Sequence, residues 1–133
     1  MQAADVTFPS TIGHLVDTFR IYLPARGIPD VTVQPKLPTR KTARMVTVSD
    51  DGGPSADGIL RRRHRINVWA ATPTDAENLA IVVADCMRSR LRMRDVVGPV
   101  EVTDSDDDAI TVAGHPLTHH LLSGVLLVRA RNL

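Results

Sequence analysis

The sequence predicts an α+β fold, in which two main helices pack against an antiparallel or mixed β-sheet. Three observations predict it: two segments with apolar residues at helical spacing, several segments that alternate apolar and polar residues, and the grouping of the predicted strands in contiguous runs. The chain has 133 residues, so we expect one domain spanning 1–133. Because 43% of the residues are apolar and 23% are charged, an ordered core is expected.

The first helix is predicted over 12–23. Its apolar residues recur at helical spacing and form one face, and they are Ile12, Leu15, Val16, Phe19 and Leu23. Ser10 and Thr11 supply an N-cap. Pro24 and Gly27 are expected to end the helix.

Two short strands are predicted next, over 31–34 and 45–49. Pro35 and Pro38 follow the first one, so we expect it to be an edge strand or to end early. Glycine, proline and serine residues over 50–57 predict a turn and loop that lead to the next strand.

The clearest strand is predicted over 58–71. Apolar residues occupy even positions there, namely Ile66, Val68 and Ala70. Polar residues occupy odd positions, namely Arg61, Arg63, Arg65 and Asn67. Alternation with period two predicts one buried face and one face that is wet or forms an interface.

The second helix is predicted from a capping box at Thr74 and Glu77 to about Leu91. A continuous apolar stripe supports it, made of Ala76, Leu79, Ala80, Val83, Met87 and Leu91. The remaining segments predict a strand over 96–102 interrupted at Gly98-Pro99, a turn over 104–108, a strand over 109–113 and a final strand over 118–129.

The charged residues are unevenly distributed, although the net charge is only +1. Basic residues cluster at Arg61, Arg62, Arg63 and Arg65 and at Arg88, Arg90, Arg92 and Arg94, and acidic residues cluster at Asp104, Asp106, Asp107 and Asp108. Separate patches of opposite sign suit a protein that meets other protein surfaces, including copies of itself. The low net charge and the four aromatic residues argue against nucleic-acid recognition as the main function.

Arg61, Arg63 and Arg65 should project from one face of their strand. Three interpretations of this row remain open. It could form salt bridges to an acidic patch of a neighbouring subunit, line a channel that carries DNA, or be a solvated sheet face.

The sequence contains no recognisable catalytic, metal or cofactor site. His119 and His120 point to opposite faces of a strand, so only His115 and His119 could converge, and no further ligand completes a tetrahedral set. The aspartate run lacks the glycine and terminal glutamate of a calcium loop, and neither a P-loop nor a nucleophile elbow is present. We therefore predict that the protein is not an enzyme and uses no cofactor.

Cys86 is the only cysteine, which predicts a structural thiol and a reducing compartment. The chain shows no apolar run long enough to span a bilayer and no signal-peptide pattern, so we expect no membrane association.

Three segments resemble the tail terminator proteins of long-tailed, siphovirus-type bacteriophages. Residues 16–24 (Val-Asp-Thr-Phe-Arg-Ile-Tyr-Leu-Pro) are similar to the opening helix of that family. Residues 65–80 resemble the family's long strand, Thr/Asp-Ala junction and following helix, and 43–60 resemble its hairpin with an intervening loop. The resemblance covers nearly the whole chain in order and length.

The resemblance implies a structural virion protein that forms a ring of identical subunits, expected to be a hexamer. Such a ring caps the tail tube, ends polymerisation of the tube protein and joins the tail to the head–tail connector or stopper protein. It implies a place at the head-proximal end of the tail, assembly in the host cytoplasm, and passage of DNA through the lumen without sequence-specific binding. Another head–tail completion protein, a host α/β protein-binding module and a small enzyme are the alternatives.

Two sets of contact residues are predicted on this basis. Inter-subunit or lumen contacts are expected at Arg61, Arg63, Arg65, Asp104, Asp106, Asp107 and Asp108. Contacts with the tube or the connector are expected at Lys36, Arg40, Lys41, Arg44, Asp50, Asp51 and Asp57. A ring needs complementary patches on different sides of each subunit, so we expect the aspartate run to face an arginine cluster of the neighbour.

Overall fold

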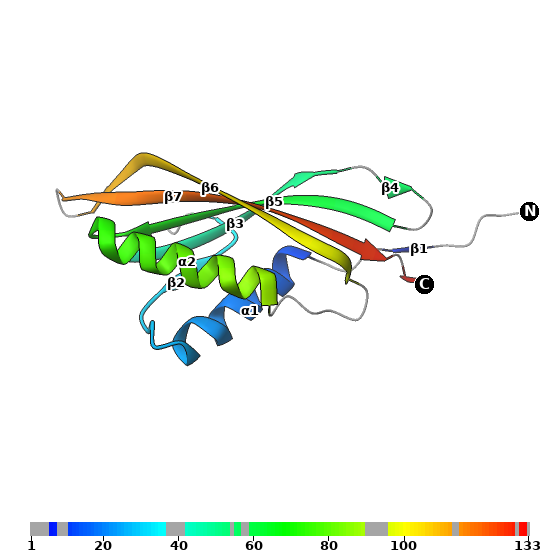
Figure 1. Cartoon of the computed structure of the whole chain (residues 1–133), viewed down its shortest axis with the longest axis horizontal. Helices are drawn as coiled ribbons and strands as arrows, with labels where there is room; N and C mark the ends of the chain where they lie inside the picture. The colour runs from blue at the N-terminus through cyan, green and yellow to red at the C-terminus, as the bar shows by residue number, and fades with distance from the viewer. Residues whose placement is uncertain are drawn as a thin grey trace, which may run out of the picture.

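The computed structural model describes residues 6–7, 11–36, 42–53, 55–56, 59–89, 96–112, 115–129 and 131–132. Within these residues it confirms the predicted α+β class. Two helices, α1 (Thr11–Ala25) and α2 (Pro73–Ser89), pack against a mixed β-sheet. Both helices lie on the same side of the sheet (Figure 1).

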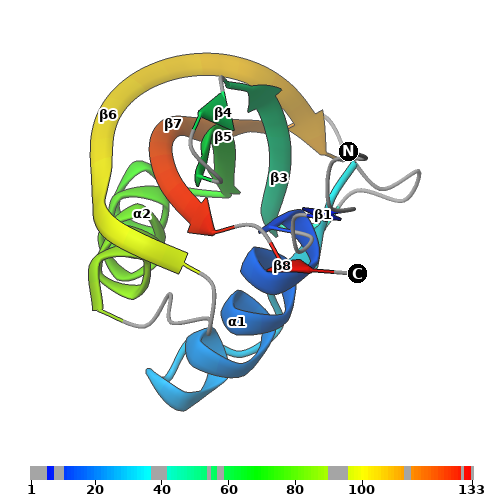
Figure 2. The ribbon, with the colours of Figure 1, turned by 90° about the vertical axis from the view of Figure 1, so that its right-hand side faces the viewer.

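The main sheet has six strands within the described residues: β2 (Thr32–Gln34), β3 (Arg44–Gly52), β4 (Ser55–Ala56), β5 (Ile59–Ala70), β6 (Val96–Val112) and β7 (His115–Arg129). Their order is β2-β3-β5-β7-β6, and β4 pairs with β5. β2 runs parallel to β3, whereas the other pairs are antiparallel. The sheet curls strongly, and β6 arches around the strands inside it (Figure 2).

A second, two-stranded sheet joins the two ends of the described chain. β1 (Val6–Thr7) pairs antiparallel with β8 (Arg131–Asn132).

Helix α1 confirms the predicted apolar face but ends later than predicted. The expectation that Pro24 ends the helix was wrong, because a proline removes only its own N–H and the turn still closes through a 3.0 Å bond from Arg26 N–H to the Tyr22 carbonyl. Gly27 ends the helix, as predicted, with φ +80°. The amides of Gly27 and Ile28 donate to the carbonyls of residues 24 and 23 at 3.0 Å each, which is a Schellman motif.

Helix α2 begins before the predicted capping box. The box at Thr74 and Glu77 was wrong, since the Thr72 hydroxyl accepts the Asp75 N–H at 3.1 Å and Pro73 is the first helical residue. Proline suits this first position because its missing N–H would have no intrahelical partner there. The helix ends at Ser89, and Leu91 lies outside the described residues.

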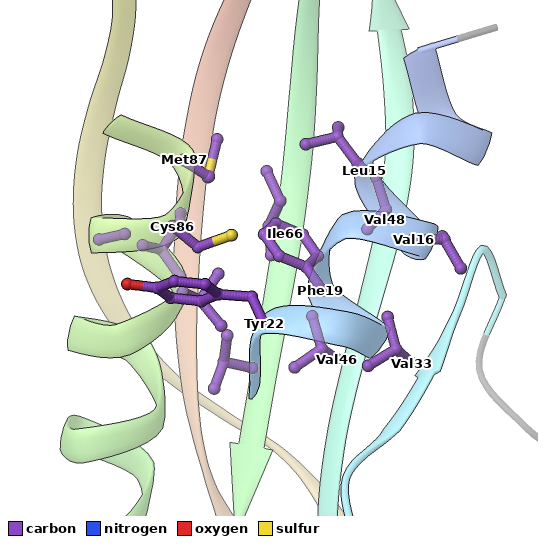
Figure 3. Close-up of a cluster of buried hydrophobic side chains, with 14 of the residues drawn as sticks. Leu15, Val16, Phe19, Tyr22, Val33, Val46, Val48, Ile66, Cys86 and Met87 are labelled. Carbon is purple, nitrogen blue, oxygen red and sulfur yellow. The ribbon is translucent and has the colours of Figure 1, made fainter. Parts of the chain in front are cut away.

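The main core lies between the two helices and one face of the sheet (Figure 3). Ile66, Val68 and Ala70 of β5 are fully buried, as the alternation predicts. Cys86 is also fully buried, which agrees with a structural thiol. The other large side chains buried there are Leu15, Phe19, Leu23, Val46, Val48, Leu79, Met87, Leu122 and Leu126.

Strand β6 departs most from the prediction. The expected turn over 104–108 and the separate strand over 109–113 were wrong: one strand runs over Val96–Val112 and pairs with β7. Gly98-Pro99 falls where the register shifts between Val97 and Glu101, so it is an irregularity within one strand rather than a break. Pairing with the long, apolar β7 outweighs the low strand propensity of aspartate.

The expected loop over 50–57 is also largely strand. β3 continues through Asp50 and Asp51 to Gly52, and β4 pairs with the start of β5. The register shifts between Asp50 and Gly52, where the glycine has φ +79°. A glycine adopts this conformation without steric cost, so the strand continues past an irregularity that the composition suggested was a loop.

A polar cluster joins the two helices at their surface. The Tyr22 hydroxyl donates to Asp85 Oδ2 at 2.7 Å, and Arg26 Nη1 donates to the same oxygen at 2.9 Å. The hydrogen bond with the Asp85 carboxylate raises the pKa of Arg26. The guanidinium of Arg26 also lies over the Tyr22 ring, 5.4 Å from its centroid.

Replacing Tyr22 with phenylalanine should lower the free energy of unfolding by about 1–2 kcal/mol, because it removes a hydrogen bond to a charged acceptor and leaves the ring in place. Urea denaturation followed by circular dichroism measures the change. The substitution Asp85→Ala should cost less in the Tyr22→Phe background than in the wild type, because the two residues share the bond. Strictly additive losses would contradict the coupling.

Candidate functional site

The arginine row, which consists of Arg61, Arg63 and Arg65, lies on the face of β5 that points away from the helices. All three side chains are exposed, whereas Leu60, His64 and Ile66, at the alternate positions, are buried. Every second residue of a strand shares one face, with about 6.8 Å between successive members. The predicted placement of the row is therefore confirmed.

The cross-strand partners of the arginine row carry no charge. Arg63 lies between Gly52 of β3 and Val125 of β7, and Arg65 lies between Ser49 and Ser123. Arg61 pairs with Leu127 of β7. The residues directly opposite the row on β3 and β7 are therefore small or apolar.

The acidic run, which consists of Asp104, Asp106, Asp107 and Asp108, belongs to β6 at the edge of the same sheet. Asp106 pairs with His120 of β7, whereas the centre of the arginine row, Arg63, pairs with Val125. These two positions are five residues apart along β7, which corresponds to about 17 Å along the strand. The arginine row lies opposite residues 123–127 of β7, and the acidic run pairs with residues 118–122.

The predicted tube or connector contacts do not gather in one place. Lys36 is exposed just after β2, and Arg44 begins β3 with Nη2 3.6 Å from Asp75 Oδ2. Asp50 and Asp51 lie near the other end of β3, where Asp50 Oδ2 is 3.5 Å from Arg62 Nε. Arg44 and Asp50 therefore lie at opposite ends of β3, whereas Lys36 follows the end of β2 that lies toward Asp50. Arg40, Lys41 and Asp57 lie outside the described residues.

His119 of β7 and His64 of β5 contact neighbouring side chains of the fold. The His119 ring stacks on Trp69 with centroids 4.9 Å apart, and its Nε2 is 2.9 Å from Asn67 Oδ1. The fully buried His64 places Nε2 2.6 Å from the Thr11 hydroxyl, which joins β5 to the start of α1. His64 belongs to no motif of the sequence, although its even position among the arginines places it on the core face.

A pocket of about 180 Å³ opens beside the start of α2. It is lined by Asp30, Ala43, Arg44, Ala71 and Asp75. Asp30 adopts φ +61°, and Arg44 forms its ion pair with Asp75 in the wall. Three of its five lining residues are charged, and two of these already pair with each other.

Among the described residues, no three histidine, cysteine, aspartate or glutamate side chains come together as a metal site would require. Of the helices in that part of the chain, neither is both long and apolar enough to cross a membrane. Comparison of the chain with protein-family models gave no match, and comparison with curated proteins gave none either.

Proposed function

We propose that this chain is the subunit of a ring that caps the tail tube of a long-tailed bacteriophage and joins it to the head connector. One observation carries the proposal: the arginine row and the acidic run occupy different, successive stretches of one sheet, opposite residues 123–127 and 118–122 of β7. A ring needs such an arrangement, because each subunit presents a patch to one neighbour and the complementary patch to the other.

The ends of β3 supply a second line of support. Arg44 lies at the start of β3, and Asp50 and Asp51 lie near its other end. A protein that stands between a tail tube and a connector needs two different contact surfaces, one on each side of the ring. The opposite placement of these charged residues suits two such surfaces, and DNA would pass through the lumen without base-specific contacts.

Electron microscopy of the protein mixed with purified tail tubes tests the proposal. We expect a ring-shaped density at one end of each tube and shorter tubes when the protein is present during polymerisation of the tube protein. Tubes that stay bare at both ends and elongate normally would contradict it.

Charge reversal of the arginine row should abolish the ring. We expect the variant with Arg61→Glu, Arg63→Glu and Arg65→Glu to fold but to leave tube ends bare, because the substituted face would repel the acidic run of a neighbour. Single substitutions supply a matched pair: Arg63→Glu should impair capping, whereas Arg88→Glu, at an exposed position on α2, should not. Normal capping by the triple variant would show that the arginine row does not form part of the interface between subunits.

A further inference from the structure

Strand β2 forms one edge of the main sheet, beside β3 (Figure 3). It pairs parallel with β3 over its three residues, Thr32–Gln34, and within the described residues no strand pairs with its other side. An edge strand presents backbone N–H and C=O groups to which another strand can add. The outer side of β2 is therefore a place where a second chain can extend the sheet.

The backbone N–H and C=O of Val33 point to this outer side. Successive residues of a strand direct these groups to opposite sides, so Thr32 and Gln34 face one way and Val33 faces the other. If Val33 faced β3, the pairing of Gln34 with its partner on β3 would need the N–H of residue 35. That residue is Pro35, which has no N–H, so Thr32 and Gln34 bond to β3 and Val33 points away from it.

Arg20 of α1 occupies the acceptor at this outer side. Its Nε and Nη2 both donate to the Val33 carbonyl oxygen, at 3.0 Å and 2.8 Å. Hydrogen bonds from a charged donor are stronger than those from a neutral amide, so an incoming strand must first displace the guanidinium. The Val33 side chain is buried in the main core, which holds the carbonyl in place for Arg20.

We propose that the outer side of β2 is a docking surface for the same strand of a second copy of this chain, and that Arg20 holds this surface closed. The inference goes beyond the proposed function and does not rest on it. A closed β2 edge suits a ring subunit, because a two-fold contact between strands would compete with the head-to-tail contacts of a ring.

The β2 edge is complementary to itself. Two such edges related by a two-fold axis run antiparallel, with Val33 opposite Val33 of the second copy. Outward-pointing residues that face each other in an antiparallel pair exchange two N–H···O bonds. Asp30 and Lys36 are both exposed and lie beyond the two ends of β2, so Asp30 of each copy comes beside Lys36 of the other. Opposite charges at both ends of the contact select a second copy as the occupant.

The substitution Arg20→Met tests the closure, because it removes the donors and keeps a long apolar stem. Arg88→Met is the matched control: it makes the same chemical change and the same loss of charge at an exposed position of α2. Sedimentation velocity of the wild type and both variants at equal concentrations measures self-association. Circular dichroism and thermal melting establish that each variant folds, and Arg20→Ala serves if Arg20→Met does not fold, since alanine is the best helix former.

We expect Arg20→Met to form a dimer with an association constant at least about tenfold above that of the wild type, because the released carbonyl can accept the Val33 N–H of a second copy. Arg88→Met should match the wild type. The species should have the mass of two chains, because the two-fold contact uses up the edge of both copies.

Two further measurements identify the contact. Hydrogen exchange followed by NMR should show that the Val33 amide of the Arg20→Met variant exchanges more slowly as protein concentration rises. Adding Lys36→Glu to Arg20→Met should weaken the dimer about tenfold, because like charges then meet at both ends of the contact. Adding Asp30→Lys as well should restore the dimer.

Three results would overturn the inference. The first is a folded Arg20→Met or Arg20→Ala variant that associates no more than Arg88→Met does. The second is association without concentration-dependent protection of the Val33 amide, which would place the contact elsewhere. The third is equal protection of this amide in the wild type, which would show that Arg20 does not close the edge.

Discussion

Replacing Ile66 with alanine lowers the free energy of unfolding by about 2–5 kcal/mol. Ile66 is fully buried in β5, where it faces the core beneath both helices (Figure 3). The substitution removes buried methyl and methylene groups and leaves a cavity that the surrounding side chains fill only partly. The loss is a large fraction of the 5–15 kcal/mol that is typical of a folded domain.

The same chemical change at Ile21 supplies the control. Ile21 lies on α1 with 75% of its surface exposed, so Ile21→Ala should change the free energy of unfolding by about 0.5 kcal/mol or less. Urea denaturation of the wild type and both variants measures the difference. Losses of similar size at the two positions would show that the core is not where the structure places it.

The substitution Gly53→Ala should cost more than about 2 kcal/mol and distort the start of β5. A Cβ atom on Gly53 would stand 1.6 Å from the Arg61 carbonyl oxygen, and that oxygen belongs to the backbone. No side-chain rotation relieves this overlap, so the chain between β3 and β5 must move. Since Arg61 is part of the arginine row, self-association should weaken together with stability.

Gly27 provides a matched control for Gly53. It has φ +80°, but nothing lies within 4 Å of a Cβ added there. Gly27→Ala therefore carries only the conformational cost of a left-handed residue, about 1–2 kcal/mol. Chemical denaturation gives both losses, and amide spectra show whether β5 has moved. A smaller loss at Gly53 than at Gly27 would contradict the close approach of the two backbone segments.

The arginine row and the acidic run link the fold to the proposed assembly. The arginine row needs β5 to stay extended, because only a regular strand keeps every second side chain on one face. The acidic run needs β6 to pair with β7, because this pairing holds the run at the edge. Substitutions in the core should therefore impair self-association only to the extent that they unfold the sheet, whereas charge reversal should impair it without unfolding.

Local patterns were sufficient for the elements whose residues pack on one continuous face. Alternation over 58–71 predicted β5 and the exposed side of Arg61, Arg63 and Arg65 correctly. Helical spacing predicted both helices, although the cap of α2 is Thr72 rather than Thr74 and α1 ends two residues later than predicted. These features depend on neighbours within a few residues, so local sequence patterns are sufficient to predict them.

Tertiary structure alone decided where the acidic run lies and how far it stands from the arginine row. Aspartates in sequence predict a turn, since their strand propensity is low, yet cross-strand pairing with β7 holds them in β6. The separation of Arg44 from Asp50 and Asp51 likewise follows from the length of β3 and its partners. Strand pairing joins residues that are distant in the chain, so its register depends on the whole sheet and no local pattern encodes it.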